Sequence, residues 1–220
     1  MRIGILGTGD VGQAIGARLV ELGHEVRLGS RTAGNEKAAA WARNAGAKAS
    51  AGTFADAARH GEVLFNCTLG TASVEALRAA GEASLAGKVI VDVANPLDFS
   101  KGFPPSLFVS NTDSLAETIQ RAFPKAKVVK ALNTMWCGVM VNPRMLPDTH
   151  HTYLSGDDGA AKDVVRGLLR QFGWKGEEIV DLGDLSTARG TESVLPLWVR
   201  IYGATKSGAF NFKIVAAKPG

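Results

Sequence analysis

Short apolar runs alternate along this chain with stretches in which apolar residues recur at helical spacing. The runs cover residues 2–6, 24–28, 63–68, 88–93 and 127–132, and a weaker one covers 47–50. Runs of this length that are apolar on both faces are typical of buried parallel strands. Between them, the i, i+4 spacing of Val11, Ile15 and Leu19 predicts an amphipathic helix. The pattern therefore predicts an α/β fold with a doubly wound, mostly parallel sheet.

Further elements follow from the same periodicities. Helices are predicted at residues 36–44, 53–60, 73–80, 110–123 and 160–172, and short strands at 152–155 and 179–182. Thr53 and Asp56 fit a capping box at the start of one of these helices. Residues 98–110, which contain Gly102, Pro104 and Pro105, predict a long loop that is either a lid or a disordered excursion.

The C-terminal part is expected to form a small helical appendage. Ser186 is placed to cap a helix that Pro196 should kink. The apolar stripe of this helix comprises Val194, Leu197, Trp198, Ile201 and Tyr202. Such a stripe either packs on the main domain or forms a dimer interface, where aromatic residues are enriched. We therefore expect one large domain over residues 1–184, followed by a helical segment over 185–220 that covers the site, forms a dimer interface, or does both.

The first apolar run leads directly into a glycine motif. Its residues are Gly7, Thr8, Gly9, Asp10, Val11 and Gly12, a GxGxxG between a strand and a helix. In this context Gly7 permits a tight turn, Gly9 leaves no side chain between the backbone and a pyrophosphate, and Gly12 lets the helix lie close to the sheet. The free N–H groups at the start of the helix then face the phosphates. The motif predicts a Rossmann-type fold in which these six residues contact a bound dinucleotide.

The residues after the second predicted strand indicate which dinucleotide is bound. An acidic residue at this point would accept hydrogen bonds from the ribose of NAD, but the chain has Gly29, Ser30, Arg31 and Thr32 instead. A guanidinium and hydroxyls are the groups that bind a 2′-phosphate, so NADP(H) is the predicted cofactor. The alternative for Arg31 is a solvated surface arginine that does not contact the cofactor. Lys37 either reaches the same phosphate or is a solvated helix lysine.

Small polar groups follow three more of the predicted strands. The residues are Thr68 and Leu69, then Ala94, Asn95 and Pro96, and finally Asn133 and Thr134. The carboxyl ends of parallel strands meet at one rim, where open α/β sheets bind ligands. The backbone of Asn95 must be extended because a proline follows it. This conformation aims the Asn95 amide toward the place where a nicotinamide carboxamide would lie. The alternative is that Asn95 is a simple turn asparagine. We expect Thr68, Asn95, Pro96, Asn133 and Thr134 to line the nicotinamide and acceptor site.

Composition argues against several other classes of protein. The formal net charge is +4, but no cluster of five or more Lys and Arg residues points to nucleic acid, so a small anionic molecule is the expected partner. No apolar run is long enough to span a membrane and no secretory pattern precedes the first strand, so a cytoplasmic protein without a membrane partner is expected. Cys67 and Cys137 lie in apolar contexts typical of free buried thiols. His150 and His151 point to opposite faces of an extended segment, so no metal site is expected.

These residues resemble one known family, the coenzyme F420-dependent NADP oxidoreductases, whose NADP-binding half is also similar to the cytoplasmic domain of the STEAP ferric reductases. The resemblance covers nearly the whole chain. Its motifs are ILGTGDVG and LGSR near the N-terminus, DVANP, KALNT, and LSTARGTESVLPL near the C-terminus. It implies that Thr8, Ser30, Arg31 and Lys37 hold the 2′-phosphate, and that the C-terminal helix covers the pocket and helps to form a homodimer.

Two positions depart from the archaeal members of this family. Asn133 stands where they have a histidine, and Leu195 stands where they have a threonine; both positions lie near the deazaflavin. Ser193 matches. The resemblance therefore implies that Asn133, Thr134, Ser193 and Leu195 contact the second substrate, and it supports the NADP-binding half more strongly than the identity of that substrate.

The expected reaction is hydride transfer between NADP(H) and a second ring. The sequence has no nucleophile elbow and no metal-ligand spacing, and the two cofactors carry the chemistry themselves, so no acid–base residue is required. Three hypotheses follow: an F420-dependent oxidoreductase, an NADPH-dependent flavin and ferric reductase, and a redox sensor that binds NADP(H) without turnover. Reduction of F420, NADPH consumption that depends on FMN or FAD, and tight NADPH binding without oxidation would separate them.

Overall fold

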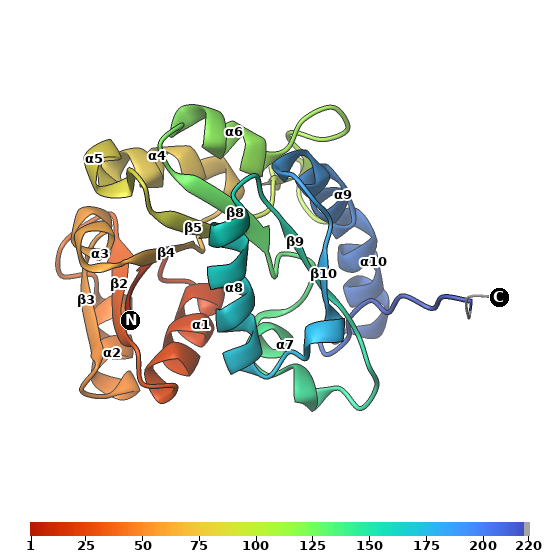
Figure 1. Ribbon diagram of the computed structural model, residues 1–220, viewed down its shortest axis with the longest axis horizontal. Helices are drawn as coiled ribbons and strands as arrows, with labels where there is room; N and C mark the ends of the chain where they lie inside the picture. Colours follow the sequence, from red (N-terminus) through yellow and green to blue (C-terminus); the bar gives the residue numbers. More distant parts are fainter. Residues whose placement is uncertain (218–220) are drawn as a thin grey trace.

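The computed structural model describes residues 1–217, and its central feature is one eight-stranded sheet (Figure 1). The strand order is β10-β9-β8-β5-β4-β1-β2-β3. The strands are β1 (Arg2–Leu6), β2 (Glu25–Ser30), β3 (Ala49–Thr53), β4 (Val63–Asn66), β5 (Val89–Asp92), β8 (Lys127–Ala131), β9 (Thr152–Ser155) and β10 (Ile179–Asp181). All neighbouring pairs are parallel except β8 and β9. The order from β3 through β1 to β8 is that of a Rossmann fold, so the predicted doubly wound sheet is confirmed.

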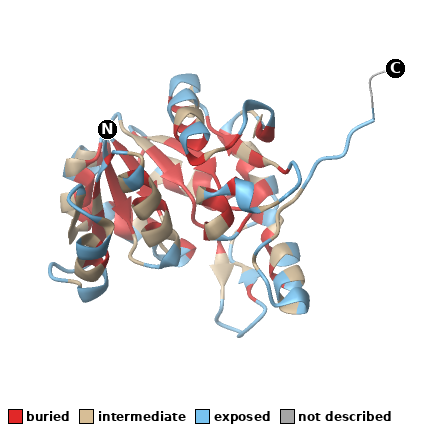
Figure 2. Cartoon of the chain, turned by 90° about the horizontal axis from the view of Figure 1, so that it is seen from below, coloured by how far each residue is buried: buried red, intermediate tan, exposed pale blue. Residues whose placement is uncertain are grey.

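Helices cover both faces of the sheet. They are α1 (Asp10–Glu21), α2 (Glu36–Ala45), α3 (Phe54–His60), α4 (Gly70–Ala80), α5 (Glu82–Leu85), α6 (Leu115–Ala122), α7 (Cys137–Val141), α8 (Gly159–Phe172), α9 (Ala188–Ser193) and α10 (Leu195–Thr205). One apolar core joins α1, α2, α7 and α8 to the sheet, and the second joins α3, α4, α5, α6 and α9 to the opposite face. Figure 2 shows the buried strands between helices whose outer sides are exposed. None of the helices in the described part of the chain is long and apolar enough to cross a membrane.

Local sequence explains where several helices begin. The predicted capping box of α3 is confirmed, since Asp56 N donates to Thr53 Oγ1 at 3.1 Å and Thr53 N donates to Asp56 Oδ2 at 2.9 Å. In α6 the Ser114 hydroxyl accepts from Glu117 N at 3.1 Å. Because this cap fixes the start of α6 at Leu115, the helix predicted from residue 110 begins five residues too early.

The predicted loop at 98–110 contains a short hairpin. Strands β6 (Leu97–Asp98) and β7 (Ser106–Leu107) pair in antiparallel fashion, and Phe108 N donates to Pro96 O at 3.0 Å. These backbone bonds tie the segment to the end of β5, so it is an ordered hairpin rather than the disordered excursion that was one alternative. The other alternative, a lid, stays a prediction.

The C-terminal segment differs from the single kinked helix that the sequence predicts. The 3₁₀ turn η3 (Leu185–Thr187) leads into α9. The helix is interrupted at Val194, and α10 begins at the next residue. Pro196 lies in the first turn of α10, where its missing N–H leaves no helical bond unmade. The cap is also different, because Ser186 N donates to Asp184 Oδ1 at 2.9 Å.

The buried face of α10 differs from the predicted stripe. Leu195 and Val199 are buried, whereas Leu197 and Tyr202 of the predicted stripe are 53% and 42% exposed. Trp198 stacks on Tyr202 and on Phe210 of the tail that follows. The prediction of the stripe is therefore wrong in part. Packing of Leu185 and Ala188 in the second core places the start of the segment on the main domain. The last three residues of the expected segment 185–220 lie outside the described residues.

Candidate active site

The glycine motif forms a tight turn between β1 and α1. Gly7 has a φ of +120°, and its N–H donates to Gly29 O at 3.1 Å, which ties the turn to β2. A Cβ on Gly7 would lie 2.5 Å from Cys67 O, and one on Gly12 would lie 2.2 Å from Gly7 O. These two contacts leave room only for glycine, in agreement with the turn and close-packing roles expected for them.

Gly9 occupies a different environment. A Cβ there would have no heavy atom within 4 Å, and Gly9 is the N-cap of α1 without a side-chain hydrogen bond. The N–H groups of the first turn of α1 are thus free of side-chain caps beside an open space. A bare helix N-terminus next to an uncrowded glycine is the cradle that a pyrophosphate requires. The residues present therefore fit a dinucleotide.

The other residues of the motif support this turn. Gln13 Nε2 donates to Thr8 O at 2.8 Å, and Trp41 Nε1 of α2 donates to Gln13 O at 3.1 Å. Thr8 and Val11 are half-buried and Asp10 is exposed. These bonds fix the loop to α1 and, through Trp41, to α2.

The end of β2 places the residues expected at the 2′-phosphate. Ser30 is buried, and its hydroxyl donates to Thr32 O at 2.6 Å, which shapes the turn that follows. Arg31 and Thr32 on this turn are exposed, and so is Lys37 in the first turn of α2. Ser30 can still accept a hydrogen bond through its oxygen, and the two cationic side chains are free to reach an anion.

A row of polar side chains crosses the carboxyl end of the sheet. Asn66 of β4 lies opposite Asp92 of β5, and Asp92 lies opposite Lys130 of β8. Asn66 Nδ2 donates to Asp92 Oδ1 at 2.8 Å, and Lys130 Nζ donates to Asp92 Oδ2 at 2.7 Å. All three side chains are buried on the face that α4, α6 and α9 cover.

Glu192 of α9 completes a buried ionic cluster with Asp92 and Lys130. Its Oε1 lies 2.7 Å from Lys130 Nζ, and the exposed fractions of Asp92, Lys130 and Glu192 are 0%, 1% and 2%. Burial raises the pKa of Glu192, although the nearby ammonium of Lys130 opposes this rise. Burial by itself lowers the pKa of Lys130, but the carboxylates of Asp92 and Glu192 bring it above its ordinary value. Lys130 is therefore charged throughout the neutral range.

Hydrogen bonds at the carboxyl end of the sheet hold several of the residues predicted at the nicotinamide end. Thr68 donates to Asn66 Oδ1 at 2.7 Å. Asn95 Nδ2 donates to Asn133 O at 2.9 Å, and Asn133 Nδ2 donates to Asn95 Oδ1 at 2.9 Å. The structure thus brings Thr68, Asn95 and Asn133 to one rim, but the amide of Asn95 pairs within the chain instead of facing open space.

The exposure of the remaining predicted residues varies widely. Leu69 at the start of α4 is 71% exposed, whereas Ala94, Pro96, Asn133 and Thr134 are buried. Ser193, at the end of α9, is exposed, and Leu195 is buried. Asn133 also donates to Thr191 O at 3.1 Å, so this side chain acts from beneath the rim on both Asn95 and α9.

Among residues 1–217, the titratable groups nearest the rim are paired or stay protonated. The carboxylate of Asp92 and the ammonium of Lys130 are paired beneath it. Burial, together with the nearby Asp92 carboxylate, raises the pKa of the Cys67 thiol well above its usual range. The thiol stays protonated at neutral pH, so it is a poor nucleophile.

Sequence reasoning missed the ionic cluster. Asn66 and Asp92 are the last residues of their apolar strands and Lys130 is the last but one of its strand, and these polar positions were an available signal. Glu192, which completes the cluster, lies far along the chain in the motif LSTARGTESVLPL. That motif entered the sequence analysis only as part of the resemblance to a family.

The fold and the glycine cradle define a Rossmann-type dinucleotide-binding protein. Comparison with known proteins is more specific. A model of the family described as NADP oxidoreductase, coenzyme F420-dependent, matches residues 2–96. A candidate F420-dependent NADP reductase from Arthrobacter sp. FB24, known from a crystal structure, is 46% identical to this chain in sequence. The two structures have a TM-score of 0.92, and the match covers 98% of this chain and 100% of that one. The chain belongs to the coenzyme F420-dependent NADP oxidoreductase family, and it is an NADP-dependent oxidoreductase.

Two curated relatives extend the comparison. The F420-dependent NADP reductase of Methanothermobacter marburgensis is 29% identical over 210 residues, which cover 91% of this chain and 92% of that protein. The metalloreductase STEAP3 of Rattus norvegicus is 32% identical over 206 residues, which cover 90% of this chain. The match spans only 38% of the length of STEAP3.

Proposed function

We propose that this protein transfers hydride between NADP(H) and a deazaflavin of the F420 type. The observation that supports this proposal best is the 46% identity, over the full length of both chains, to a candidate F420-dependent NADP reductase. The Methanothermobacter enzyme, of similar length, supports the same second substrate. When bound, the nicotinamide supplies or accepts the hydride.

The chain itself supplies binding and orientation. The turn from Gly7 to Gly12 holds the pyrophosphate, and Ser30, Arg31 and Lys37 hold the 2′-phosphate. The nicotinamide end lies against Thr68, Leu69, Ala94, Asn95 and Pro96. Since both rings carry their own chemistry, the rim contributes by fixing their distance and excluding water.

The acceptor lies between this rim and the segment that begins at residue 185. We expect Ser193, which is exposed at the end of α9, to touch the acceptor, with the buried Thr134 and Leu195 behind it. Asn133 is buried and orients Asn95. This proposal assigns cofactor binding to residues 1–184 and acceptor contact to the segment that follows, together with Thr134 at the rim.

The direct test is a spectroscopic assay with purified components. Mixing the protein, NADPH and oxidised F420 is expected to bleach the deazaflavin absorption band while NADPH is consumed in equal amount, with one proton taken up per hydride. NADH in place of NADPH should react at least about 10-fold more slowly, because it lacks the phosphate that Arg31 binds. A protein that binds NADPH but leaves the F420 band unchanged would contradict the proposal and favour a redox sensor.

A second acceptor has support from a specific observation. STEAP3 is called a metalloreductase, and its similarity covers 90% of this chain. Under this alternative, a riboflavin-type flavin takes the hydride and passes electrons to ferric iron. NADPH consumption that requires FMN or FAD, and that F420 does not stimulate, would favour this alternative over the first.

Replacing Arg31 with alanine should change cofactor choice. The expected loss of NADPH affinity is about 2 kcal/mol, or roughly 30-fold, because a charge-assisted hydrogen bond to the 2′-phosphate disappears. NADH affinity should stay within about 2-fold. Fluorescence titration with both cofactors measures the difference, and Arg43→Ala, which removes an exposed arginine in the last turn of α2, is the matched control. Equal losses for NADPH and NADH would mean that Arg31 does not contact the phosphate.

A further inference from the structure

The buried ionic cluster of Asp92, Lys130 and Glu192 has no part in the hydride transfer described above. Lys130 Nζ donates to Asp92 Oδ2 at 2.7 Å and to Ala94 O at 2.5 Å, and it lies 2.7 Å from Glu192 Oε1. Transferring three charges out of water is costly, and apolar residues of similar size often stabilise a fold equally well. The cluster therefore calls for an explanation other than stability.

One side of the cluster holds the cofactor rim. Asp92 Oδ1 accepts from Ala94 N at 3.3 Å, and Lys130 donates to Ala94 O. Both backbone polar groups of Ala94 are thus bound to the cluster, immediately before Asn95 and Pro96. Displacing Lys130 would release the carbonyl that leads into Asn95.

The other side holds α9. Glu192 Oε2 accepts from Leu115 N at 2.8 Å and Oε1 accepts from Ala116 N at 3.1 Å, so this carboxylate joins α9 to the start of α6 as well as to Lys130. The neighbouring bond from Asn133 to Thr191 O reaches the same helix. Lys130 is the group that touches both sides.

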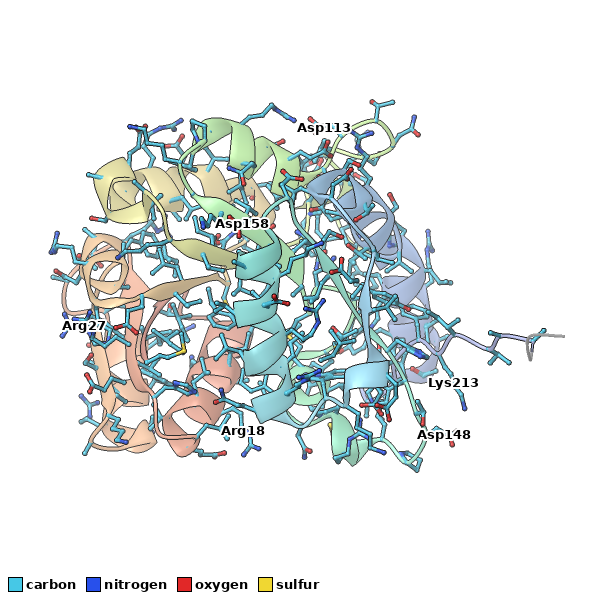
Figure 3. The ribbon with its side chains drawn as sticks, in the orientation of Figure 1. Arg18, Arg27, Asp113, Asp148, Asp158 and Lys213 are labelled. Carbon is cyan, nitrogen blue, oxygen red and sulfur yellow. The ribbon has the colours of Figure 1, made fainter. Side chains whose placement is uncertain are left out.

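A half-buried ion pair joins the same two helices farther out. Arg189 of α9 pairs with Glu117 of α6 at 2.6 Å. Asp113, labelled in Figure 3, precedes α6 and pairs at 2.6 Å with Arg121 of that same helix, so this second pair does not reach α9. The pair of Arg189 and Glu117 does not contact Ala94, so it offers a comparison in which α9 is loosened without any change at the rim.

We propose that Lys130 is a positioning residue that couples the cofactor rim at Ala94 and Asn95 to helix α9, so that binding of NADP(H) fixes the segment that receives the acceptor. The second half of this statement rests on the proposed function, because it takes the acceptor to lie against α9. The first half requires only that the cofactor contacts the rim.

One variant loosens α9 without removing a contact at the rim. Glu192→Gln removes the charge on α9 that pairs with Lys130, and it leaves Lys130 on Asp92 Oδ2 and Ala94 O. The control, Glu117→Gln, neutralises the outer ion pair by the same change of charge. Circular dichroism confirms that each protein is folded at the assay temperature.

Steady-state kinetics with F420 then tests the coupling. Glu192→Gln is expected to raise the KM for F420 about 10-fold or more while the Kd for NADPH stays within about 3-fold. The control should change both by less than about 2-fold. The same KM in all variants, or an equal rise in the control, would overturn the proposal.

Amide hydrogen exchange on the wild-type protein tests the same link without a variant or an acceptor. Adding NADPH is expected to slow exchange in residues 188–193 by about 5-fold or more, as well as in the peptide containing 94–96. Protection at 94–96 with none at 188–193 would overturn the proposal even if F420 is reduced. Protection at both, in a protein that does not reduce F420, would refute the proposed acceptor and leave the coupling in place.

Discussion

Replacing Lys130 with methionine is expected to lower the free energy of unfolding by about 3–5 kcal/mol, the cost typical of breaking a buried ion pair from one side. Methionine fills nearly the same space, but it leaves the carboxylates of Asp92 and Glu192 buried, close together and without their shared cation. The amide groups that remain on them, from Asn66, Leu115 and Ala116, satisfy some of their oxygens without neutralising the charge. Urea denaturation followed by circular dichroism at neutral pH measures the loss.

The same strand supplies the control for this experiment. Lys127 of β8 pairs with Asp158 at 2.9 Å, but the two side chains are 41% and 35% exposed. Lys127→Met should therefore cost less than about 1 kcal/mol. Adding Asp92→Asn and Glu192→Gln to Lys130→Met should restore part of the lost stability, since no unpaired charge is then buried. Equal losses from Lys127→Met and Lys130→Met would mean that the cluster is hydrated.

Replacing Gly9 with alanine is expected to weaken NADPH binding by about 100-fold, which corresponds to about 2.7 kcal/mol, while leaving the fold intact. The backbone at Gly9 is extended, with φ and ψ of −77° and 179°, so alanine adopts it without strain. Its methyl group would meet no protein atom within 4 Å. It would instead project into the space over the first turn of α1, where the backbone must approach the pyrophosphate.

Calorimetric titration with NADPH and a thermal unfolding curve separate these effects. Gly167→Ala in α8, where a Cβ would also have no atom within 4 Å, is the control and should bind NADPH normally. Gly12→Ala should instead damage the fold, because its Cβ would lie 2.2 Å from Gly7 O. A Gly9→Ala protein with wild-type affinity would show that the glycine turn does not hold the pyrophosphate.

The nucleotide-binding half could be predicted closely because its signals are local. The strand before Gly7 and the helix after it are adjacent in sequence, and the same holds for Thr53 and the helix that it caps. The apolar runs of β4, β5 and β8 are continuous, so their burial required no knowledge of partners.

The ionic cluster and the C-terminal helices depend on contacts that sequence does not reveal. A lysine at the end of a strand is ordinarily read as solvated, and Lys130 is buried only because α9 brings Glu192 to it from 62 residues away. The buried face of α10 is likewise not the stripe that the periodicity predicts, because Leu195 and Val199 are buried and Leu197 is exposed.

The shape of the turn after β2 has a bearing on how such an enzyme could change its coenzyme. Ser30 builds the turn from inside, whereas Arg31, Thr32 and Lys37 project outward from it. Substitutions at exposed positions usually alter stability by less than about 0.5 kcal/mol. Natural variation or laboratory selection can therefore exchange these three side chains without repacking the interior, and under the proposed function such exchanges alter the preference between phosphorylated and unphosphorylated adenosine.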